Sequence, residues 1–323
     1  MTAPLLDVDS LRVTFDTPRG PVLAVDGVSL QVGAGEVLGL VGESGSGKSV
    51  TLRAITRLLR RATVTGQVLW RGRDLLTQPE PALHAVRGRE VAMIFQEPMA
   101  ALNPVLTIGQ QIEESLAAHG TLDRRARRAR ALELMDLVGI AAGAQRLGAY
   151  PHEFSGGMRQ RAMIAIALAP QPMLLLADEP TTALDVTIQD QVLKLLLRLA
   201  DELSMAMVLV THDLGVVAET CSRVCVMYAG RVAEAGPVAD VFAHPRHAYT
   251  AALLRSMPRP GPARGRLAPI PGQPPRLDQA IPGCPFVPRC GLVEVRCPTL
   301  APPLVPVAPA HQAACWSSAR VAS

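Results

Sequence analysis

Lysine is nearly absent from this 323-residue sequence: Lys48 and Lys194 are the only two, and the other basic side chains are arginines. Aromatic residues make up 3% of the chain, and the formal net charge is only +4. A charge this small does not indicate a general nucleic-acid-binding surface. The longest apolar stretch, residues 162–177, is interrupted by Pro170 and Pro172. The sequence therefore offers no run of about 20 apolar residues for a transmembrane helix.

We also expect no secretory signal, because residues 1–10 carry neither a positively charged segment nor an apolar one. We therefore expect the protein to stay in the cytoplasm, where thiols are kept reduced. The six cysteines are then poor candidates for disulfides. Four of them lie after residue 283, which makes metal ligation the alternative to consider.

The pattern of apolar residues predicts an α/β fold. Residues 11–15 and 28–32 alternate between apolar and polar, which is typical of strands with one exposed face. Further along, continuous apolar segments alternate with helical patterns, and such units predict a parallel sheet covered on both faces. The strands are expected at 36–41, 173–177 and 205–210, and the helices at 157–168 and 187–203.

Residues 105–143 also have a helical pattern, with five arginines between positions 124 and 130. These arginines could form a stripe that binds RNA, or they could lie on a solvated helix face. No aromatic residue is interleaved with them, so the solvated face is the preferred interpretation.

The most informative segment is residues 42–49, which fits the pattern G-x-x-x-x-G-K-[ST] and follows the strand expected at 36–41. In such a loop, glycines let backbone N–H groups surround a phosphate, and the following helix adds the positive end of its dipole. Lys48 can reach the β- and γ-phosphates, and the Ser49 hydroxyl can bind Mg²⁺. The nucleotide-binding residues expected here are Gly42, Ser44, Gly45, Gly47, Lys48, Ser49 and Val50.

Two acidic residues follow the strand expected at 173–177. Asp178 is suited to hold Mg²⁺, directly or through water, and Glu179 is suited to orient and polarise the attacking water. The alternative is that the pair merely caps a helix. Adjacent carboxylates with separate roles favour hydrolysis of the nucleotide over transfer to an acceptor.

A second phosphate-facing element is expected at residues 154–161, where Ser155, Gly156 and Gly157 begin a helix. Such a helix end presents free N–H groups and a hydroxyl to an anion. An ordinary serine-capped helix start would look the same. Since the chain already has one phosphate loop, a second element makes sense if it faces the nucleotide of a neighbouring subunit.

Taken together, these segments resemble the nucleotide-binding subunits of ABC transporters. Residues 154–158 resemble the family's signature L-S-G-G-Q, with Phe for Leu and Met for Gln. The remaining matches occur in the family's order and by resemblance imply further site residues. They are Gln96 as the Q-loop glutamine that reaches the metal, Asp185 in the D-loop Ala183-Leu184-Asp185, His212 as the switch histidine at the γ-phosphate, and Phe15 as a candidate for stacking on adenine.

The resemblance implies an ABC-type ATPase with ATP and Mg²⁺ as ligands, the metal being held by Ser49, Gln96 and Asp178. It implies a RecA-like core, an antiparallel β subdomain and a helical subdomain at about 97–165, all within residues 1–258. Two such domains would close head to tail around two ATP molecules. A plain core role for Phe15 remains open.

Details of the sequence resemble the peptide-importer branch of this family, specifically a dipeptide/oligopeptide ATPase of the D type. They are residues 16–20, 95–104, 150–158, 244–250 and 270–275. The implied partners are an F-type sister ATPase, two permeases and an extracytoplasmic binding protein, with the chain peripheral at the cytoplasmic face of the membrane. Met99, Leu102 and Val105 are expected to contact a permease, with a loop packed on its own domain as the alternative. The alternatives are import of nickel or glutathione, and a soluble ABC ATPase that acts on DNA or ribosomes.

The C-terminal segment, residues 259–323, is rich in proline and is expected to be irregular. Its cysteines, Cys284, Cys290, Cys297 and Cys315, are spaced C-x5-C-x6-C-x17-C. Four thiolates suit tetrahedral zinc or an iron–sulfur cluster. The resemblance favours a [4Fe–4S] cluster, with zinc or no metal as alternatives. Cys221 and Cys225 are expected to be small buried side chains.

Overall fold

The computed structural model describes residues 3–182, 184–257 and 269–321. Contacts divide the chain into two compact units. Unit 1 comprises the described residues of 1–32, 37–76 and 211–323, and unit 2 those of 33–36 and 77–210. None of the helices in the described part of the chain combines the length and apolarity that crossing a bilayer needs. The boundary expected at residue 258 lies outside the described residues, so the division into 1–258 and 259–323 stays a prediction.

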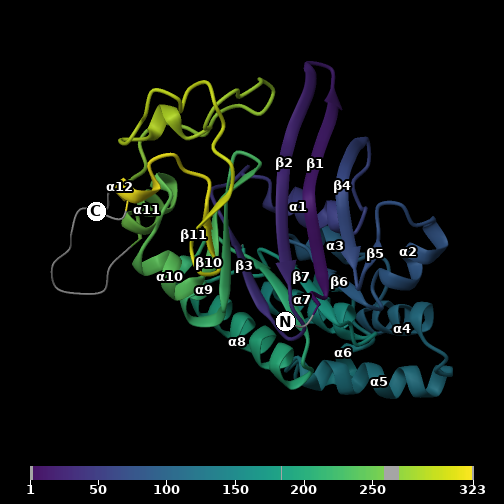
Figure 1. Ribbon diagram of the computed structural model, residues 1–323. Coiled ribbons are helices and arrows are strands. Elements are labelled where there is room, and N and C mark those ends of the chain that lie inside the picture. The colour runs from purple at the N-terminus through teal and green to yellow at the C-terminus, as the bar shows by residue number, and fades with distance from the viewer. Residues whose placement is uncertain (1–2, 183, 258–268, 322–323) are drawn as a thin grey trace, which may run out of the picture. The chain divides into compact units, whose positions relative to one another are not determined.

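Unit 1 contains a four-stranded antiparallel sheet, in which Leu11, Val13, Val25, Val28 and Val68 are all fully buried. The alternation noted in the sequence places these side chains on one face, while the polar positions between them stay at the surface. The antiparallel subdomain is therefore as predicted. The strands run in the order β2 (Gly20–Val32), β1 (Leu6–Thr17), β4 (Ala62–Trp70) and β5 (Arg73–Asp74), as Figure 1 shows for β2, β1 and β4.

A second set of strands in unit 1 has, at one edge, the strand that leads into the phosphate loop. At the other edge it has two strands of the C-terminal segment. In order they are β3 (Val37–Val41), β9 (Arg223–Tyr228), β10 (Arg231–Pro237), β12 (His311–Ala313) and β11 (Val305–Ala308). The β3–β9 pair is parallel and the others are antiparallel. The helices of unit 1 are α1 (Lys48–Ile55), α9 (Leu214–Thr220), α10 (Val238–Ala243), α11 (Ala248–Arg255), α12 (Ser318–Val321) and the 3-10 helix η2 (Val287–Arg289).

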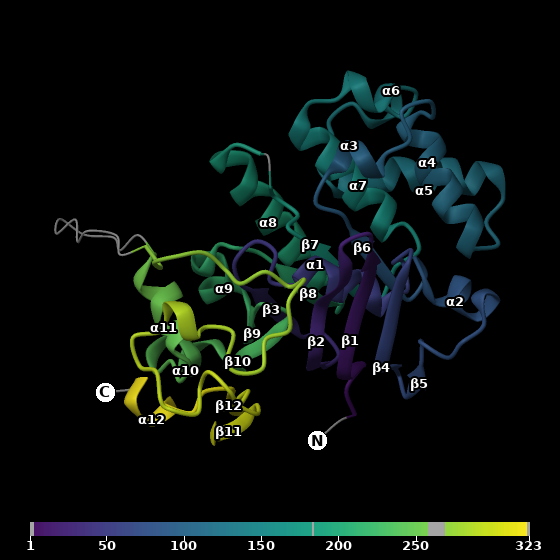
Figure 2. The ribbon, with the colours of Figure 1, turned by 90° about the horizontal axis from the view of Figure 1, so that it is seen from above.

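The described part of the C-terminal segment, residues 269–321, contains short strands and helices where the sequence predicted an irregular chain. Its hairpin β11–β12 extends the sheet at β10, beside which it lies in Figure 2. Phe286 is 1% exposed, and its ring meets those of Tyr228 and Tyr249 with centroids 5.3 and 5.4 Å apart. The segment is thus held in part by the core of unit 1, because Tyr228 and Tyr249 provide the site that Phe286 fills.

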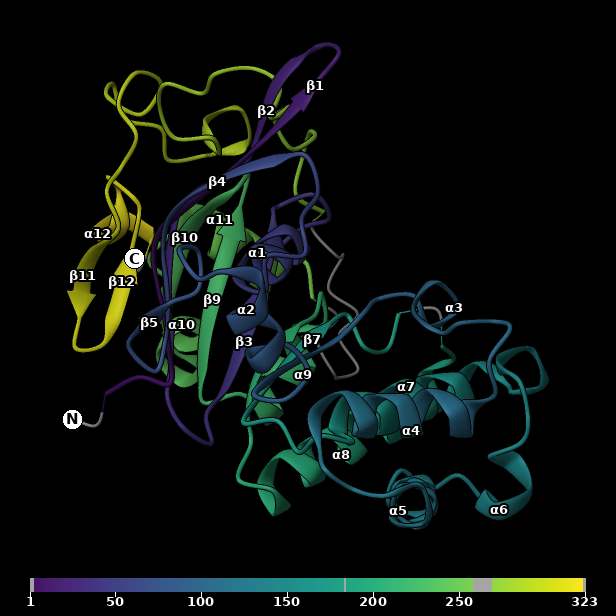
Figure 3. The same cartoon turned by 90° about the vertical axis from the view of Figure 1, so that its right-hand side faces the viewer.

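Unit 2 is built on a short parallel sheet in the order β8 (Ala206–Val210), β7 (Leu174–Asp178) and β6 (Val91–Ile94). Every residue of β7 and β8 is buried, as the continuous apolar runs predicted. The helices of this unit, several of which gather together in Figure 3, are α2 (Glu80–Val86), α3 (Pro98–Ala101), α4 (Ile108–His119), α5 (Arg124–Leu137), α6 (Gly143–Arg146), α7 (Gly156–Leu168), α8 (Val186–Glu202) and the 3-10 helix η1 (Pro151–Glu153).

The arginine-rich helix α5 supports the solvated-face interpretation. Arg128 pairs with Glu113 at 3.1 Å, and Arg130 pairs with Glu133 at 2.8 Å. Its apolar residues Leu134 and Met135 are fully buried. The helix thus has an inward apolar face and an outward face of charges paired with neighbouring carboxylates.

Candidate functional site

The phosphate loop connects β3 to α1, and two of its glycines occupy positions that have no space for a side chain. Gly42 and Gly47 have φ values of 151° and 100°. A Cβ at Gly42 would lie 2.2 Å from the carbonyl oxygen of Met227, and one at Gly47 would lie 2.7 Å from that of Ala24. Gly45 also has a positive φ, of 76°, but no heavy atom lies within 4 Å of its Cβ position. Close packing therefore requires glycine at two positions of the motif, whereas at the third position only the positive φ favours it.

Lys48 lies at the start of α1 and is only 4% exposed. Its Nζ donates to the carbonyl oxygens of Gly42 at 2.8 Å and Glu43 at 2.9 Å. Ser49 and Val50 follow in the first turn of the helix, which contains no acidic side chain. The positive end of the helix and the ammonium group are thus on the same loop, as an anionic ligand requires.

The loop also has partners that the sequence analysis missed. The Glu43 carboxylate receives two hydrogen bonds from Arg289, from Nη1 at 2.7 Å and Nη2 at 2.9 Å. The backbone N–H of Glu43 donates to the hydroxyl of Tyr249 at 2.9 Å. No motif spacing links these residues, because Arg289 lies 246 positions after Glu43.

In unit 2 the structure brings Gln96 and Glu179 together. Asp178 ends β7 and is fully buried, and Glu179 follows it with φ 46°, in the left-handed region. The N–H of Glu179 donates to the carbonyl of Val210 at 3.1 Å. Its Oε2 accepts hydrogen bonds from Gln96 Nε2 at 3.1 Å and from Thr182 Oγ1 at 2.7 Å. The carboxylate is therefore held in one orientation by two donors.

The signature segment is at the start of α7, where Ser155 is the N-cap and its Oγ accepts from the N–H of Met158 at 3.4 Å. Ser155 and Gly156 are exposed, whereas Phe154 is 2% exposed and anchors the turn. A Cβ at Gly157 would lie 2.8 Å from Ile188 Cγ2. This segment therefore presents a hydroxyl and the N-terminus of a 13-residue helix to its surroundings.

Three other predicted site residues have different surroundings. Asp185 is the N-cap of α8, where its Oδ1 accepts from the N–H of Ile188 at 3.0 Å, so a capping role accounts for part of its placement. His212 is exposed in unit 1. Phe15 is half-buried on β1, opposite Val22 of β2. Ala183 of the expected D-loop lies outside the described residues.

The four C-terminal cysteines are free thiols that line one cavity. Burial, with a smaller contribution from the three neighbouring thiols, raises the pKa of Cys284 to about 11. The N–H groups of Leu292 and Glu294 donate to the sulfurs of Cys290 and Cys297, each at 3.3 Å. Within the described residues, however, no group of three or more His, Cys, Asp or Glu side chains is arranged to hold a metal ion.

The two remaining cysteines match the expectation of buried side chains. Cys221 and Cys225 are 8% and 2% exposed, and burial raises the pKa of Cys225 to about 12. Such a thiol stays protonated near neutral pH and behaves as a small apolar group.

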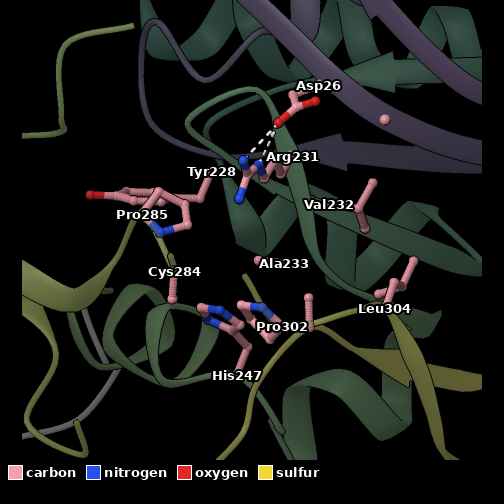
Figure 4. Close-up of a pocket in the computed structure, with 12 residues that line it drawn as sticks. Asp26, Tyr228, Arg231, Val232, Ala233, His247, Cys284, Pro285, Pro302 and Leu304 are labelled. Atoms are coloured by element: carbon pink, nitrogen blue, oxygen red, sulfur yellow. Dashed lines mark hydrogen bonds and ion pairs between the residues drawn. The ribbon is translucent and has the colours of Figure 1, made fainter. Parts of the chain in front are cut away.

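A second cavity, next to the cysteines, is lined by Asp26, Arg231, His247 and Cys284 among others (Figure 4). Arg231 donates to Asp26 through Nε at 2.8 Å. His247 Nδ1 accepts from the N–H of Tyr249 at 3.0 Å, so the neutral ring carries its proton on Nε2. Burial lowers the pKa of His247 to about 4, and the ring is therefore neutral near pH 7.

Comparison with known proteins adds the family context. The sequence matches the family described as ABC transporter over residues 25–182, and the family described as oligopeptide/dipeptide transporter, C-terminal region, over residues 233–297. It is 51% identical over 321 residues to the probable peptide ABC transporter ATP-binding protein y4tR of Sinorhizobium fredii, covering 98% of this chain and 96% of that protein. A putative peptide import ATP-binding protein of Brucella melitensis is also 51% identical, over 97% of this chain and 96% of that protein.

Solved structures agree with this relationship. The dimeric ATP-binding cassette MJ0796, in a post-hydrolysis state with ADP and Pi, is similar with a TM-score of 0.65 and 29% identity, covering 72% of this chain and 98% of that one. The structure of cbiO1 from Clostridium perfringens, part of the transporter complex cbiONQ, is similar with a TM-score of 0.63 and 26% identity, covering 75% and 92%.

Proposed function

This chain belongs to the ATP-binding proteins of ABC transporters, in the branch with an oligopeptide/dipeptide C-terminal region, and from this premise we propose that it energises the import of di- and oligopeptides by hydrolysing ATP. The observation that carries the proposal is the phosphate loop, in which Gly42 and Gly47 leave no space for a side chain and Lys48 lies at the helix start. The loop fits a triphosphate, because its N–H groups, helix end and ammonium group all favour an anion.

Hydrolysis is assigned to the residues that follow β7. Glu179 is the group that orients and polarises the attacking water, and its two hydrogen bonds from Gln96 and Thr182 fix the carboxylate for that task. Ser49, Asp178 and Gln96 would hold Mg²⁺, which supplies charge neutralisation to the phosphates when it is bound. His212 is assigned to the γ-phosphate.

The signature residues Ser155, Gly156 and Gly157 would serve the nucleotide of a second ATPase subunit. This is supported by the exposure of Ser155 and Gly156, which leaves the N-terminus of α7 accessible. We propose an F-type sister subunit as the partner in a head-to-tail heterodimer. Asp185 would lie at its interface, and Phe15 would stack on adenine.

The membrane partners are permease subunits, and an extracytoplasmic binding protein would deliver the solute to them. The chain would lie peripherally at the cytoplasmic face of the membrane. Met99 and Val105 are 51% and 75% exposed and are the proposed permease contacts. Leu102 was expected to join them, but it is 4% exposed and packs inside unit 2, so it is not a contact residue.

For the C-terminal cysteines we propose a metal group, a [4Fe–4S] cluster in the first instance and zinc as the alternative. The support is that all four thiols line one cavity and that two of their sulfurs already accept backbone hydrogen bonds. A bound group would keep this segment ordered. Metal analysis of anaerobically purified protein tests the idea, and protein with neither iron nor zinc would contradict it.

The transport function is tested with the chain reconstituted in liposomes together with its two permeases and its sister ATPase. Peptide-loaded binding protein should stimulate ATP hydrolysis, whereas binding protein given nickel or glutathione should not. Lys48→Ala in the same complex should bind ATP about 10- to 100-fold more weakly, because charge-assisted bonds to the phosphates are lost. Stimulation by nickel or glutathione alone would change the assigned cargo without changing the ATPase.

A further inference from the structure

One side chain of the C-terminal segment reaches the phosphate loop itself. Arg289, in η2, makes a two-pronged pair with the carboxylate of Glu43, the second residue of the loop. The Arg289 side chain is 4% exposed and that of Glu43 is 23% exposed. A guanidinium paired in this way gives both charge compensation and a fixed orientation, and its partial burial limits screening by solvent.

The guanidinium is held from several other directions. Its Nε donates to the carbonyl of Pro271 at 2.8 Å, and Nη1 also donates to the hydroxyl of Tyr228 at 3.2 Å. Its carbon lies 5.8 Å from the ring centroid of Tyr228 and 5.9 Å from that of Phe286. Arg289 is therefore ordered before any ligand arrives, so little conformational entropy opposes its contact with Glu43.

The backbone of Glu43 also makes hydrogen bonds that hold the phosphate loop. Its carbonyl oxygen accepts from Lys48 Nζ at 2.9 Å and from the N–H of Ser46 at 3.2 Å. Its own N–H is bound to Tyr249. A residue that fixes Glu43 therefore also fixes the carbonyl oxygen that accepts from Lys48 and from Ser46.

We propose that Arg289 is a positioning residue for ATP: it neutralises the Glu43 carboxylate beside the triphosphate site and holds the phosphate loop in its binding conformation. The inference rests on the proposed function, since it takes the loop to be the ATP site. Without Arg289, the carboxylate would repel the anionic triphosphate. Because Arg289 directly precedes Cys290, order in the cysteine segment also becomes a condition for tight ATP binding.

The test is the dissociation constant for a fluorescent ATP analogue, measured for the full chain together with its sister subunit. Arg289→Gln should raise this constant about tenfold, because it leaves an unpaired negative charge near the phosphates. Glu43→Gln should raise it by less than about threefold, since the repulsion disappears together with the pair. The double variant should bind like Glu43→Gln and better than Arg289→Gln.

The matched control is Arg276→Gln, which removes another arginine of the same segment. Arg276 pairs with Asp278 at 2.7 Å, and its side chain is 71% exposed. This variant should bind ATP like the wild type. Thermal unfolding of every variant separates binding from stability, because a merely structural Arg289 would lower the unfolding temperature without changing the dissociation constant.

Two results would overturn the inference: an unchanged dissociation constant for folded Arg289→Gln, or a double variant that binds as weakly as Arg289→Gln. If Arg289→Gln does not fold, Arg289→Lys decides the question. It keeps the charge but loses the two-pronged geometry, and it should bind about threefold more weakly than wild type. Wild-type protein that binds no ATP would instead remove the proposed function.

Discussion

At the scale of single residues, the glycines of the phosphate loop could be predicted and the partner of Glu43 could not. Gly42 and Gly47 occupy positions where a Cβ would strike backbone atoms, and a motif with fixed spacing carries that information. The contact between Glu43 and Arg289 joins residues far apart in the sequence, and no periodic pattern marks it. A site whose residues all lie in one short segment can thus be predicted from the sequence. A contact between residues far apart in the sequence cannot.

The assignment of Glu179 is tested by Glu179→Gln. The amide keeps the size of the side chain but cannot act as a base, so kcat should fall about a hundred- to ten-thousandfold while ATP binding persists. Single-turnover hydrolysis and nucleotide binding should be measured on the same assembled complex. Near-normal turnover would show that another group activates the water.

The buried His247 predicts a pH dependence of stability. Its folded-state pKa of about 4 lies below the ordinary histidine value of 6.5, so the unfolded chain binds the proton more readily. His247 therefore does not change the free energy of unfolding above pH 6.5. As the pH drops from 6.5 toward 4, its titration lowers that free energy by up to about 3 kcal/mol. Thermal unfolding between pH 7 and pH 4.5 measures this loss.

The matched variant for that measurement is His247→Asn. Asparagine can still accept the N–H of Tyr249 at the start of α11 but does not titrate. In this variant the stability should fall less between pH 6.5 and pH 4, because the contribution of His247 is removed. An identical pH profile in both proteins would show that other groups cause the loss.

At the scale of elements, continuous apolar strands were easier to predict than the C-terminal hairpin. β7 and β8 are buried along their whole length, which gives a strong sequence signal. The strands β11 and β12 have four and three residues, and β11 contains Pro306, so neither shows a pattern. Their existence depends on pairing with β10, which the local sequence does not encode.

The packing of the C-terminal segment is tested by Phe286→Ala. The ring is buried against Tyr228 and Tyr249, so its loss should cost about 3–5 kcal/mol of local stability. Limited proteolysis should then cut the segment faster. Val295→Ala is the control, because Val295 is 100% exposed and its truncation should change nothing. Equal protection of both variants would mean that other contacts hold the segment.

At the scale of the whole molecule, the sequence predicted the family, the ATPase activity and the mixed α/β fold, because several short motifs occur together and in the family's order. It could not predict which residues of 98–105 face outward. Leu102 is buried while Met99 and Val105 are exposed, and this difference arises from packing within unit 2. A short helix followed by a loop has too little periodicity to reveal it.

That difference gives a prediction for the assembled transporter. A photo-crosslinking amino acid placed at Met99 or Val105 should form adducts with the permease subunits, since both positions are exposed on the segment after Gln96. The same probe at Leu102 is the control and should give none, because its side chain is enclosed by its own unit. Adducts are detected by mass spectrometry of the complex with and without ATP. If no permease adduct forms at Met99 or Val105 in either state, the membrane partner docks elsewhere, and the exposed apolar residues of this segment need another explanation.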